Sequence, residues 1–349
     1  MSTKVTNILV PVISVILGLL VGAIIMLVSG YSPIAGYAAL WNGIFGDLYT
    51  IGETLRQITP YILAGLAVAF AFRSGLFNIG VEGQLIVGWF AAAYVGVAFE
   101  GLPKVIHLPF AILAAAAAGA LWGFVPGLLK AKFRVHEVIV TIMMNYIALH
   151  TTNALIRTVS GGGDRTDAIF KSASLRSDFL ANLTDFSRLH YGILLALFMV
   201  GVMWVILEKT TLGFELKAVG FNQNASQYAG MNVNKNIILA MVISGAFAGM
   251  GGAMEALGTF EYVSSKAGFT GIGFDGIAVA LLGMNTPLGV IFGATLFGSL
   301  KYGALNMPNA AGIPIEIVQI VIAVIIFFVA SGYIIRLLLA RAANKKGAK

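Results

Sequence analysis

A carboxylate lies inside an otherwise apolar stretch of this sequence. The run "RSGLFNIGVEGQLIVGWF", residues 73–90, contains Asn78, Glu82 and Gln84. An ionisable side chain within a membrane helix costs about 2.5–3.5 kcal/mol on the insertion scale, so it faces protein or a water-filled path. On a continuous helix, Asn78 and Glu82 are four residues apart and share a face, whereas Gln84 lies well around from both.

Two interpretations of these polar residues stay open. In the first, Asn78 and Glu82 present an amide and a carboxylate to a path for a polar solute. In the second, they pair with backbone groups of a helix broken around Gly80 and Gly83, because a broken helix is tolerated only where protein or water covers it.

Further polar residues lie within or beside other apolar stretches. Asn145, Asn153 and Asn285 are such positions, and Asn145 and Asn285 join the candidate path residues. Amides of this kind more often form hydrogen bonds between helices than contacts with a ligand. Phe77, Trp89 and Phe274 could stack on a ring, but aromatic residues are also common at membrane interfaces.

A weak similarity between two segments of the chain adds Asp275 to the candidate path. "FNIGVEGQLIVG" (77–88) and "FDGIAVALLG" (274–283) both start with Phe and an amide or acid, and both end in Gly. Transporters are often built from inverted repeats whose sites lie at broken helices. A pseudo-repeat would bring Asp275 into loose correspondence with the region of Asn78 and Glu82.

Several kinds of chemistry are excluded by the residues present. The chain has no cysteine, which rules out disulfides, thiolate ligands and cysteine nucleophiles. "HEVIV" at 136–140 begins like a zinc-protease motif but has Val140 where the second histidine is required. "GGGD" at 161–164 lacks the GK[ST] of a phosphate-binding loop. We therefore expect no metal site, no cofactor and no enzymatic activity in this chain.

Composition makes this an all-α polytopic membrane protein. Of its 349 residues, 58% are hydrophobic and 11% are charged, against roughly 25% charged in soluble domains. A helix needs about 20 apolar residues to cross a bilayer, which predicts about ten spans: 8–28, 58–72, 76–98, 108–129, 136–156, 190–207, 235–257, 268–284, 287–305 and 314–335. The segment 33–56 is too polar to span and is expected to form an interfacial or re-entrant helix on the outer side.

Charge predicts the orientation in the membrane. Ten spans place both termini on one side, and Lys4, the basic tail 336–349 and the cluster "KAKFR" (130–134) indicate that this side is cytoplasmic. This assignment puts 13 of the 22 Lys and Arg residues inside. The net charge of +7 is better explained by this rule than by a nucleic-acid partner.

Two polar segments interrupt the spans. Residues 157–188 are predicted to form an external loop of mixed charge. Residues 208–235 are predicted to form one or two short helices at the cytoplasmic face, with Asn222 or Asn224 as a cap and Gly230 at a left-handed end. This second segment is either an ordinary surface loop or a docking element for a soluble partner.

Five motifs in order resemble one family. "FRSGLFNIGVEGQLIVGWFAAAYVG" (72–96) resembles the signature of permease subunits of ABC importers for simple sugars, nucleosides and branched-chain amino acids. The same family shows the four later motifs at 137–149, 217–231, 246–258 and 273–298. The resemblance covers roughly residues 50–335, and "GVEGQ" with "GFDGIAVALLG" is most similar to the nucleoside branch.

The resemblance implies a single permease domain, residues 1–349, in a bacterial cell membrane. Its parts would be a first helix (8–28), a helix group (58–156), an external loop (157–188), a coupling helix (213–231), a second helix group (235–335) and a cytoplasmic tail (336–349). The implied partners are a second, shorter homologous permease, an ABC ATPase subunit that binds ATP and Mg²⁺, and an extracytoplasmic lipoprotein that delivers a nucleoside.

Roles for individual residues follow from the polar positions within the spans and, for the ATPase contact, from the resemblance. The nucleoside path would be lined by Asn78, Glu82, Gln84, Asn145, Asp275 and Asn285, because such groups can bond ribose hydroxyls and base donors. The ATPase would be contacted through Lys217, Gly220, Asn222, Asn224, Ala225, Tyr228 and Gly230.

Three other functions remain as alternatives. A simple sugar or a branched-chain amino acid could replace the nucleoside as cargo. An ion-coupled secondary transporter would need its own ion site, for which Glu82 and Asp275 are candidates. A membrane subunit that conducts nothing is the third, and the buried acids argue against it.

Overall fold

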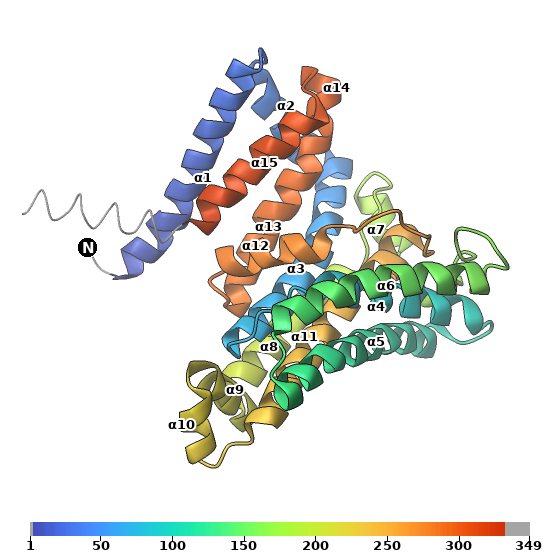
Figure 1. Cartoon of the computed structure of the whole chain (residues 1–349). Helices are drawn as coiled ribbons and strands as arrows, with labels where there is room; N and C mark the ends of the chain where they lie inside the picture. The colour runs from blue at the N-terminus through green and yellow to red at the C-terminus, as the bar shows by residue number, and fades with distance from the viewer. Residues whose placement is uncertain (1–2, 332–349) are drawn as a thin grey trace, which may run out of the picture. The chain divides into compact units, whose positions relative to one another are not determined.

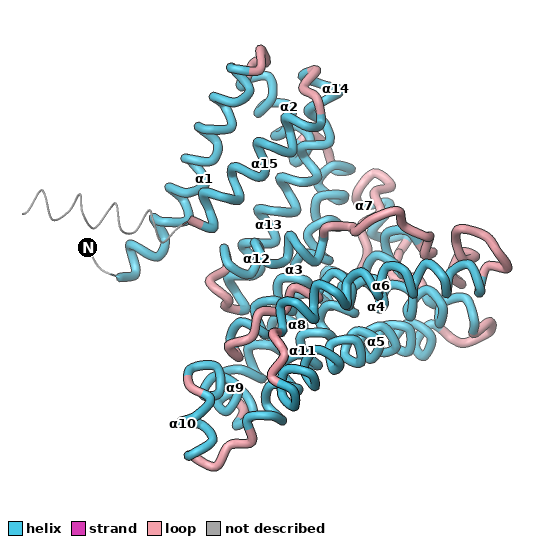
Figure 2. Tube along the Cα trace, viewed as in Figure 1, coloured by secondary structure: helices cyan, strands magenta, loops and turns pink. Residues whose placement is uncertain are grey.

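The apolar stretches fold into helices, as their composition requires, because backbone groups in lipid must be satisfied within the segment. The computed structural model describes residues 3–331, and the predicted tail 336–349 lies outside them. Within this range, the extended structure is limited to an isolated bridge between Arg165 and Ser264. Figure 2 shows helices throughout, joined by loops of different lengths.

The described residues form two compact units, residues 3–54 with 299–331 and residues 55–298. In the first unit, α1 packs against α15, and α2 packs against η3 and α14. These elements are α1 (Thr3–Val28), α2 (Pro33–Phe45), η3 (Ala304–Asn306), α14 (Met307–Ala311) and α15 (Ile315–Ala330). Ser32 caps α2, and Pro33 opens it, as is usual for a proline at a first helical position.

The second unit is built around α11, which packs against both α4 and α5. Its membrane helices are α4 (Val81–Ala98), α5 (Lys104–Phe133), α6 (Glu137–Val159), α8 (Gly192–Lys209), α11 (Val233–Met254) and α12 (Ile272–Leu282). Two more helices, α3 (Leu48–Arg73) and α13 (Pro287–Gly303), run from one unit into the other. The order of the helices along the chain can be followed in Figure 1.

Glycines allow the central helices to approach closely. A Cβ atom on Gly249 of α11 would collide with the carbonyl oxygen of Ala115 of α5, and one on Gly88 of α4 would collide with the backbone of Gly249. Small residues at such contacts drive helix association in membranes, where lipid offers no hydrophobic gain. Interior contacts of α4, α5 and α11 therefore depend on the absence of side-chain atoms.

Seven of the described helices are long and apolar enough to cross a membrane, and three shorter apolar segments accompany them at residues 15–28, 272–282 and 315–324. The all-α polytopic fold is thus confirmed, whereas the count of ten crossings stays a prediction. The boundaries near residue 50 were wrong: α3 begins at Leu48, so 48–56 belongs to a membrane helix. Hydropathy missed residues 48–56 because it counts Arg56 as a polar residue in lipid. In the structure Arg56 is 6% exposed and donates a hydrogen bond to Thr259.

Two helix ends also differ from the prediction. The helix expected from residue 76 begins at Val81, because residues 74–80 form a turn in which Gly75 has φ +74°. The helix expected to end at 257 continues beyond α11 as a π-helix, η2 (Glu255–Phe260). Segments of this type are frequent at functional sites.

The polar segment 208–235 contains two short helices, α9 (Thr211–Phe221) and α10 (Gln223–Tyr228), which gather at one end of the second unit (Figure 1). Of the two predicted caps, Asn222 and Asn224, it is Asn222 whose Oδ1 accepts a hydrogen bond from the Ala225 amide at 3.0 Å. The predicted left-handed residue is Gly230, with φ +83°. The segment 157–188 contains η1 (Lys171–Ala173) and α7 (Asp178–Leu183).

Candidate functional site

The turn between α3 and α4 brings Asn78 to Gln84. Asn78 Nδ2 donates to Gln84 Oε1 at 2.9 Å and to Ser244 Oγ of α11 at 2.8 Å. The prediction that Asn78 shares a helix face with Glu82 was wrong, because Asn78 precedes the first residue of α4. Its Oδ1 instead accepts from the Gly80 amide at 2.9 Å, which stabilises the turn.

Glu82 lies at the start of α4 and holds the start of α12. Its Oε1 accepts hydrogen bonds from the Thr270 amide and hydroxyl, both at 2.6 Å, and from the Gly271 amide at 3.0 Å. Its Oε2 accepts from the Gly273 amide at 2.7 Å. The first turn of a helix carries unsatisfied N–H groups and a partial positive charge, so a fully buried carboxylate is stabilised there.

Asn145 of α6 bridges the same region from another side. Its Oδ1 accepts from the Gly83 amide at 2.8 Å, and its Nδ2 donates to the Ile79 carbonyl at 3.0 Å. One amide side chain therefore satisfies a donor and an acceptor on either side of the turn that begins α4. We call Asn78, Glu82, Gln84, Asn145 and Ser244 the polar centre; all five are at most 1% exposed.

Two other predicted path residues lie outside the polar centre. Asp275, in the first turn of α12, accepts a hydrogen bond from the Tyr61 hydroxyl of α3 at 3.1 Å. Asn285 follows α12 in a left-handed conformation with φ +53°. The hydrogen bonds given above for the polar centre involve neither Asp275 nor Asn285.

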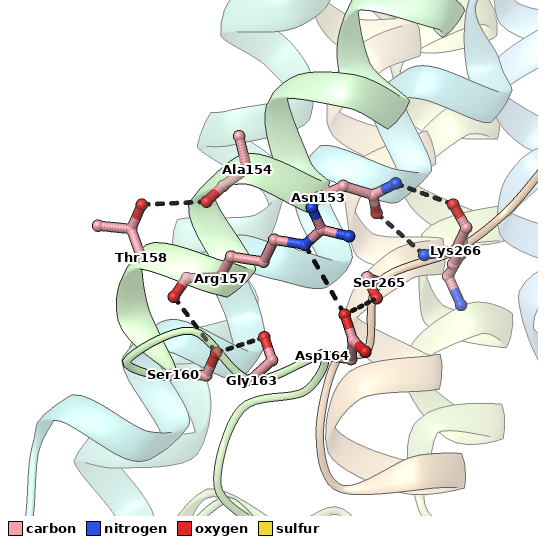
Figure 3. A network of polar contacts seen from close by, with 9 residues as sticks. All are labelled: Asn153, Ala154, Arg157, Thr158, Ser160, Gly163, Asp164, Ser265 and Lys266. Carbon is pink, nitrogen blue, oxygen red and sulfur yellow. Dashed lines mark hydrogen bonds and ion pairs between the residues drawn. The ribbon is translucent and has the colours of Figure 1, made fainter.

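A loop of residues 261–271 joins η2 to α12 and is clamped by residues that the motifs did not indicate. Asn153 of α6 donates to the Lys266 carbonyl at 2.8 Å and accepts from the Lys266 amide at 3.0 Å. Asp164 accepts from Ser265 at 3.2 Å and pairs with Arg157 at 3.7 Å. Figure 3 shows these contacts converging on the loop from α6 and from the segment that follows it.

The Lys266 side chain covers an aromatic ring. Its Nζ lies 3.9 Å from the centroid of the buried Trp89 ring, whose own Nε1 donates to the Tyr262 carbonyl at 3.1 Å. Burial lowers the pKa of Lys266, and the charges of Glu255 and Glu82 oppose that shift. The ammonium thus shields a ring that could otherwise stack on a ligand.

Arg176, which sequence reasoning missed, ties the segment 157–188 to η2. Its Nε donates to the Gly258 carbonyl at 2.8 Å, its guanidinium donates to the Thr259 carbonyl at 2.5 Å, and it pairs with Glu261 at 3.0 Å. Carbonyls that a helix end leaves unpaired need such donors. No local sequence signal identifies Arg176, because its partners lie more than 80 positions away.

The short helix α9 contacts the turn before α4, and both α9 and α10 contact α11. A Cβ on Gly75 would lie 2.7 Å from the Cα of Gly220, so these two backbones are in direct contact. Glu215 of α9 accepts from Asn236 of α11 at 2.9 Å. This end of the unit is therefore packed against the elements that carry the polar centre.

The predicted docking residues differ in their surroundings. Lys217 pairs with Glu208 at 3.1 Å, and Arg73 pairs with the same carboxylate at 3.1 Å. Asn224, Ala225 and Gly230 are exposed. Tyr228 is 95% exposed and Phe221 is 90% exposed, so this segment presents aromatic rings beyond its own fold.

The polar residues described above make contacts between different helices. Among the described residues, no group of three or more His, Asp or Glu side chains could hold a metal ion. The polar side chains instead connect helix ends to one another.

Comparisons with known proteins indicate the family of this chain. A family model described as "Branched-chain amino acid transport system / permease component" matches residues 50–330. The guanosine ABC transporter permease protein NupP of Bacillus subtilis is 65% identical over 349 residues, covering 100% of both chains. The nucleoside ABC transporter permease protein NupB of Lactococcus lactis is 42% identical, covering 98% of this chain and 96% of that protein. The guanosine permease protein NupQ of B. subtilis is 31% identical, covering 71% and 79%.

Proposed function

Because this chain belongs to the family of branched-chain amino acid transport system permease components, we propose that it forms part of the membrane path of an ATP-driven nucleoside importer. Full-length similarity to a guanosine permease and a nucleoside permease supports a nucleoside as cargo. The seven long apolar helices supply a membrane-spanning body for that path.

The observation that best supports this proposal is the contact of α9 with the turn before α4. Gly220 meets Gly75 backbone to backbone, and Asn78 follows three residues later in the same turn. A push on α9 and α10 would therefore reach the polar centre through this turn. It would reach α11 through the hydrogen bond between Glu215 and Asn236. This geometry supports the coupling role of 213–231, in which closure of an ATPase dimer moves the helices.

The proposal requires three partner chains. A separate ABC ATPase binds ATP and Mg²⁺ and docks on α9 and α10. An extracytoplasmic lipoprotein delivers the nucleoside to the side that carries 157–188. A second permease completes the path, which is supported by similarity to two guanosine permease proteins of one bacterium, NupP and NupQ. Both termini then lie in the cytoplasm.

Within this proposal, the path residues divide by their contacts. Four of them form hydrogen bonds that join α4 to neighbouring segments: Asn78, Glu82, Gln84 and Asn145. Their contribution to the path is therefore to hold the starts of α4 and α12 in place. Asp275 lies in the first turn of α12, and Asn285 lies just after the end of that helix. They stay candidates for contact with a nucleoside, and Asp275 also accepts a hydrogen bond from Tyr61.

The test is uptake of radiolabelled guanosine into vesicles. The chain alone is compared with the chain together with its neighbouring permease, ATPase and binding protein, with and without ATP. Uptake that needs every part and ATP supports the proposal. Uptake by the chain alone, driven by an ion gradient, would favour a secondary transporter. ATP-dependent uptake of a pentose or hexose without guanosine uptake would keep the ABC importer and change its cargo.

A further inference from the structure

A large pocket lies between the end of α5 and the short helix α10. Its volume is about 810 Å³. Lys130, Lys132 and Arg134 line it from α5 and the residue that closes α5, and Gln223, Asn224 and Gln227 line it from α10. The wall therefore combines cations with amides that can donate hydrogen bonds.

The positive charge of this pocket is only partly neutralised. Lys130 pairs with Glu137 at 2.7 Å. Lys132 and Arg134 are exposed, and within residues 3–331 neither has an ion-pair partner. Two cations are thus available to an anion that enters the pocket.

Exposed apolar side chains lie close to these cations along the chain. Phe133, between the two free cations, is 68% exposed, and Ile139, near the start of α6, is 61% exposed. Both belong to helices that can span a membrane. Lys132 and Arg134 therefore lie at the end of a helix that can span a membrane, which is where phospholipid head groups are expected.

We propose that this pocket binds the phosphate head group of an anionic phospholipid of the phosphatidylglycerol class. Lys132 and Arg134 pair with the phosphate, and the amides of Gln223, Asn224 and Gln227 bond the glycerol hydroxyls. The acyl chains lie along Phe133 and Ile139. Basic pockets between membrane helices are suited to such head groups, and each cation near the surface adds about 1 kcal/mol of attraction.

A soluble acidic partner fits the observations less well. The most exposed rings of this region, Phe221 and Tyr228, are not in the pocket wall. The cations of the pocket instead flank Phe133, an exposed apolar residue at the end of a helix that can span a membrane. A head group held there would connect α5 to α10 and so brace the segment that contains α9.

The experiment is native mass spectrometry of the full chain in detergent, with added phosphatidylglycerol or phosphatidylcholine. The variant Lys132→Gln/Arg134→Gln removes both free cations. Lys209→Gln/Lys235→Gln is the matched control, because it removes two exposed cations that do not line the pocket. Melting temperatures of both variants establish that the fold is retained.

We expect preferential retention of phosphatidylglycerol, reduced about 10- to 30-fold in the first variant and unchanged in the control. Equal retention of both lipids, or an equal loss in both variants, would overturn the proposal. Displacement of the lipid by millimolar inorganic phosphate would show a site for free phosphate instead. If the first variant keeps its lipid but loses co-purification of the ATPase, the surface belongs to that protein.

Discussion

The carboxylate of Glu82 accepts two hydrogen bonds from Thr270, one from its amide and one from its hydroxyl, each 2.6 Å long. Together with the bonds from Gly271 and Gly273, they join the first turn of α4 to the first turn of α12. The carboxylate of Glu82, which lies within an apolar run of the sequence, therefore satisfies backbone donors 188 to 191 positions away.

Replacing Glu82 tests this connection. Glu82→Gln removes the charge and leaves one amide NH₂ facing N–H donors, so we expect the free energy of unfolding to fall by roughly 2–5 kcal/mol. The measurement is the melting temperature and the detergent-soluble yield of a tagged chain. Glu100→Gln, at an exposed loop position, is the control and should change neither. An unchanged melting temperature with abolished uptake would instead assign Glu82 to the solute.

Close helix packing gives a second prediction. Gly249→Ala would place a methyl group against the Ala115 carbonyl, which is backbone and cannot rotate away. Overpacking of this kind costs about 1–3 kcal/mol, and we expect a lower melting temperature and lower uptake. Gly201→Ala is the matched control because its Cβ meets no atom within 4 Å. Equal melting temperatures for the two variants would contradict the role of the glycine contact.

Docking of the ATPase gives a third prediction. Phe221→Ala/Tyr228→Ala removes two rings that are 90% and 95% exposed, so the fold should be unaffected. Large aromatic residues often dominate interfaces, and we expect co-purification of the ATPase to fall about tenfold or more. Charge reversal at Lys217 is less informative because it also breaks the pair with Glu208.

The control for docking removes aromatic rings elsewhere. Phe179→Ala/Phe186→Ala removes rings that are 67% and 77% exposed, in the segment 157–188. Co-purification should be unchanged in this variant. If the variant at Phe221 and Tyr228 also retains the ATPase, α9 and α10 are not the docking segment.

The buried ammonium of Lys266 predicts a dependence on alkaline pH. Burial lowers its pKa below the ordinary value of 10.5, so between these two values the unfolded chain binds more protons than the folded chain. The free energy of unfolding therefore rises with pH across that window, and the cost of burying the charge is present below it.

Lys266→Met removes this titration while keeping an apolar side chain over Trp89. The difference in melting temperature between wild type and Lys266→Met should shift in favour of wild type as the pH rises from 7 to 10.5. Lys171→Met, at an exposed position, should show a constant difference. A constant difference for Lys266→Met as well would mean that the pKa is not lowered.

The sequence by itself determined the features that depend on composition and on near neighbours. A chain with 11% charged residues has to place helices in lipid. The cap at Asn222 and the left-handed Gly230 were predicted because each depends on a few adjacent backbone groups. The family motifs likewise lie within continuous runs of residues.

Only the tertiary structure decided which polar groups are partners. Asn78 bonds Ser244, Glu82 bonds Thr270 and Arg176 bonds Gly258, across separations that local periodicity does not encode. Hydropathy likewise could not place the start of α3, since the cost of Arg56 depends on whether protein or lipid surrounds it. Burial and hydrogen bonding are properties of the packed chain, so a polar residue in an apolar run identifies a site without revealing its partner.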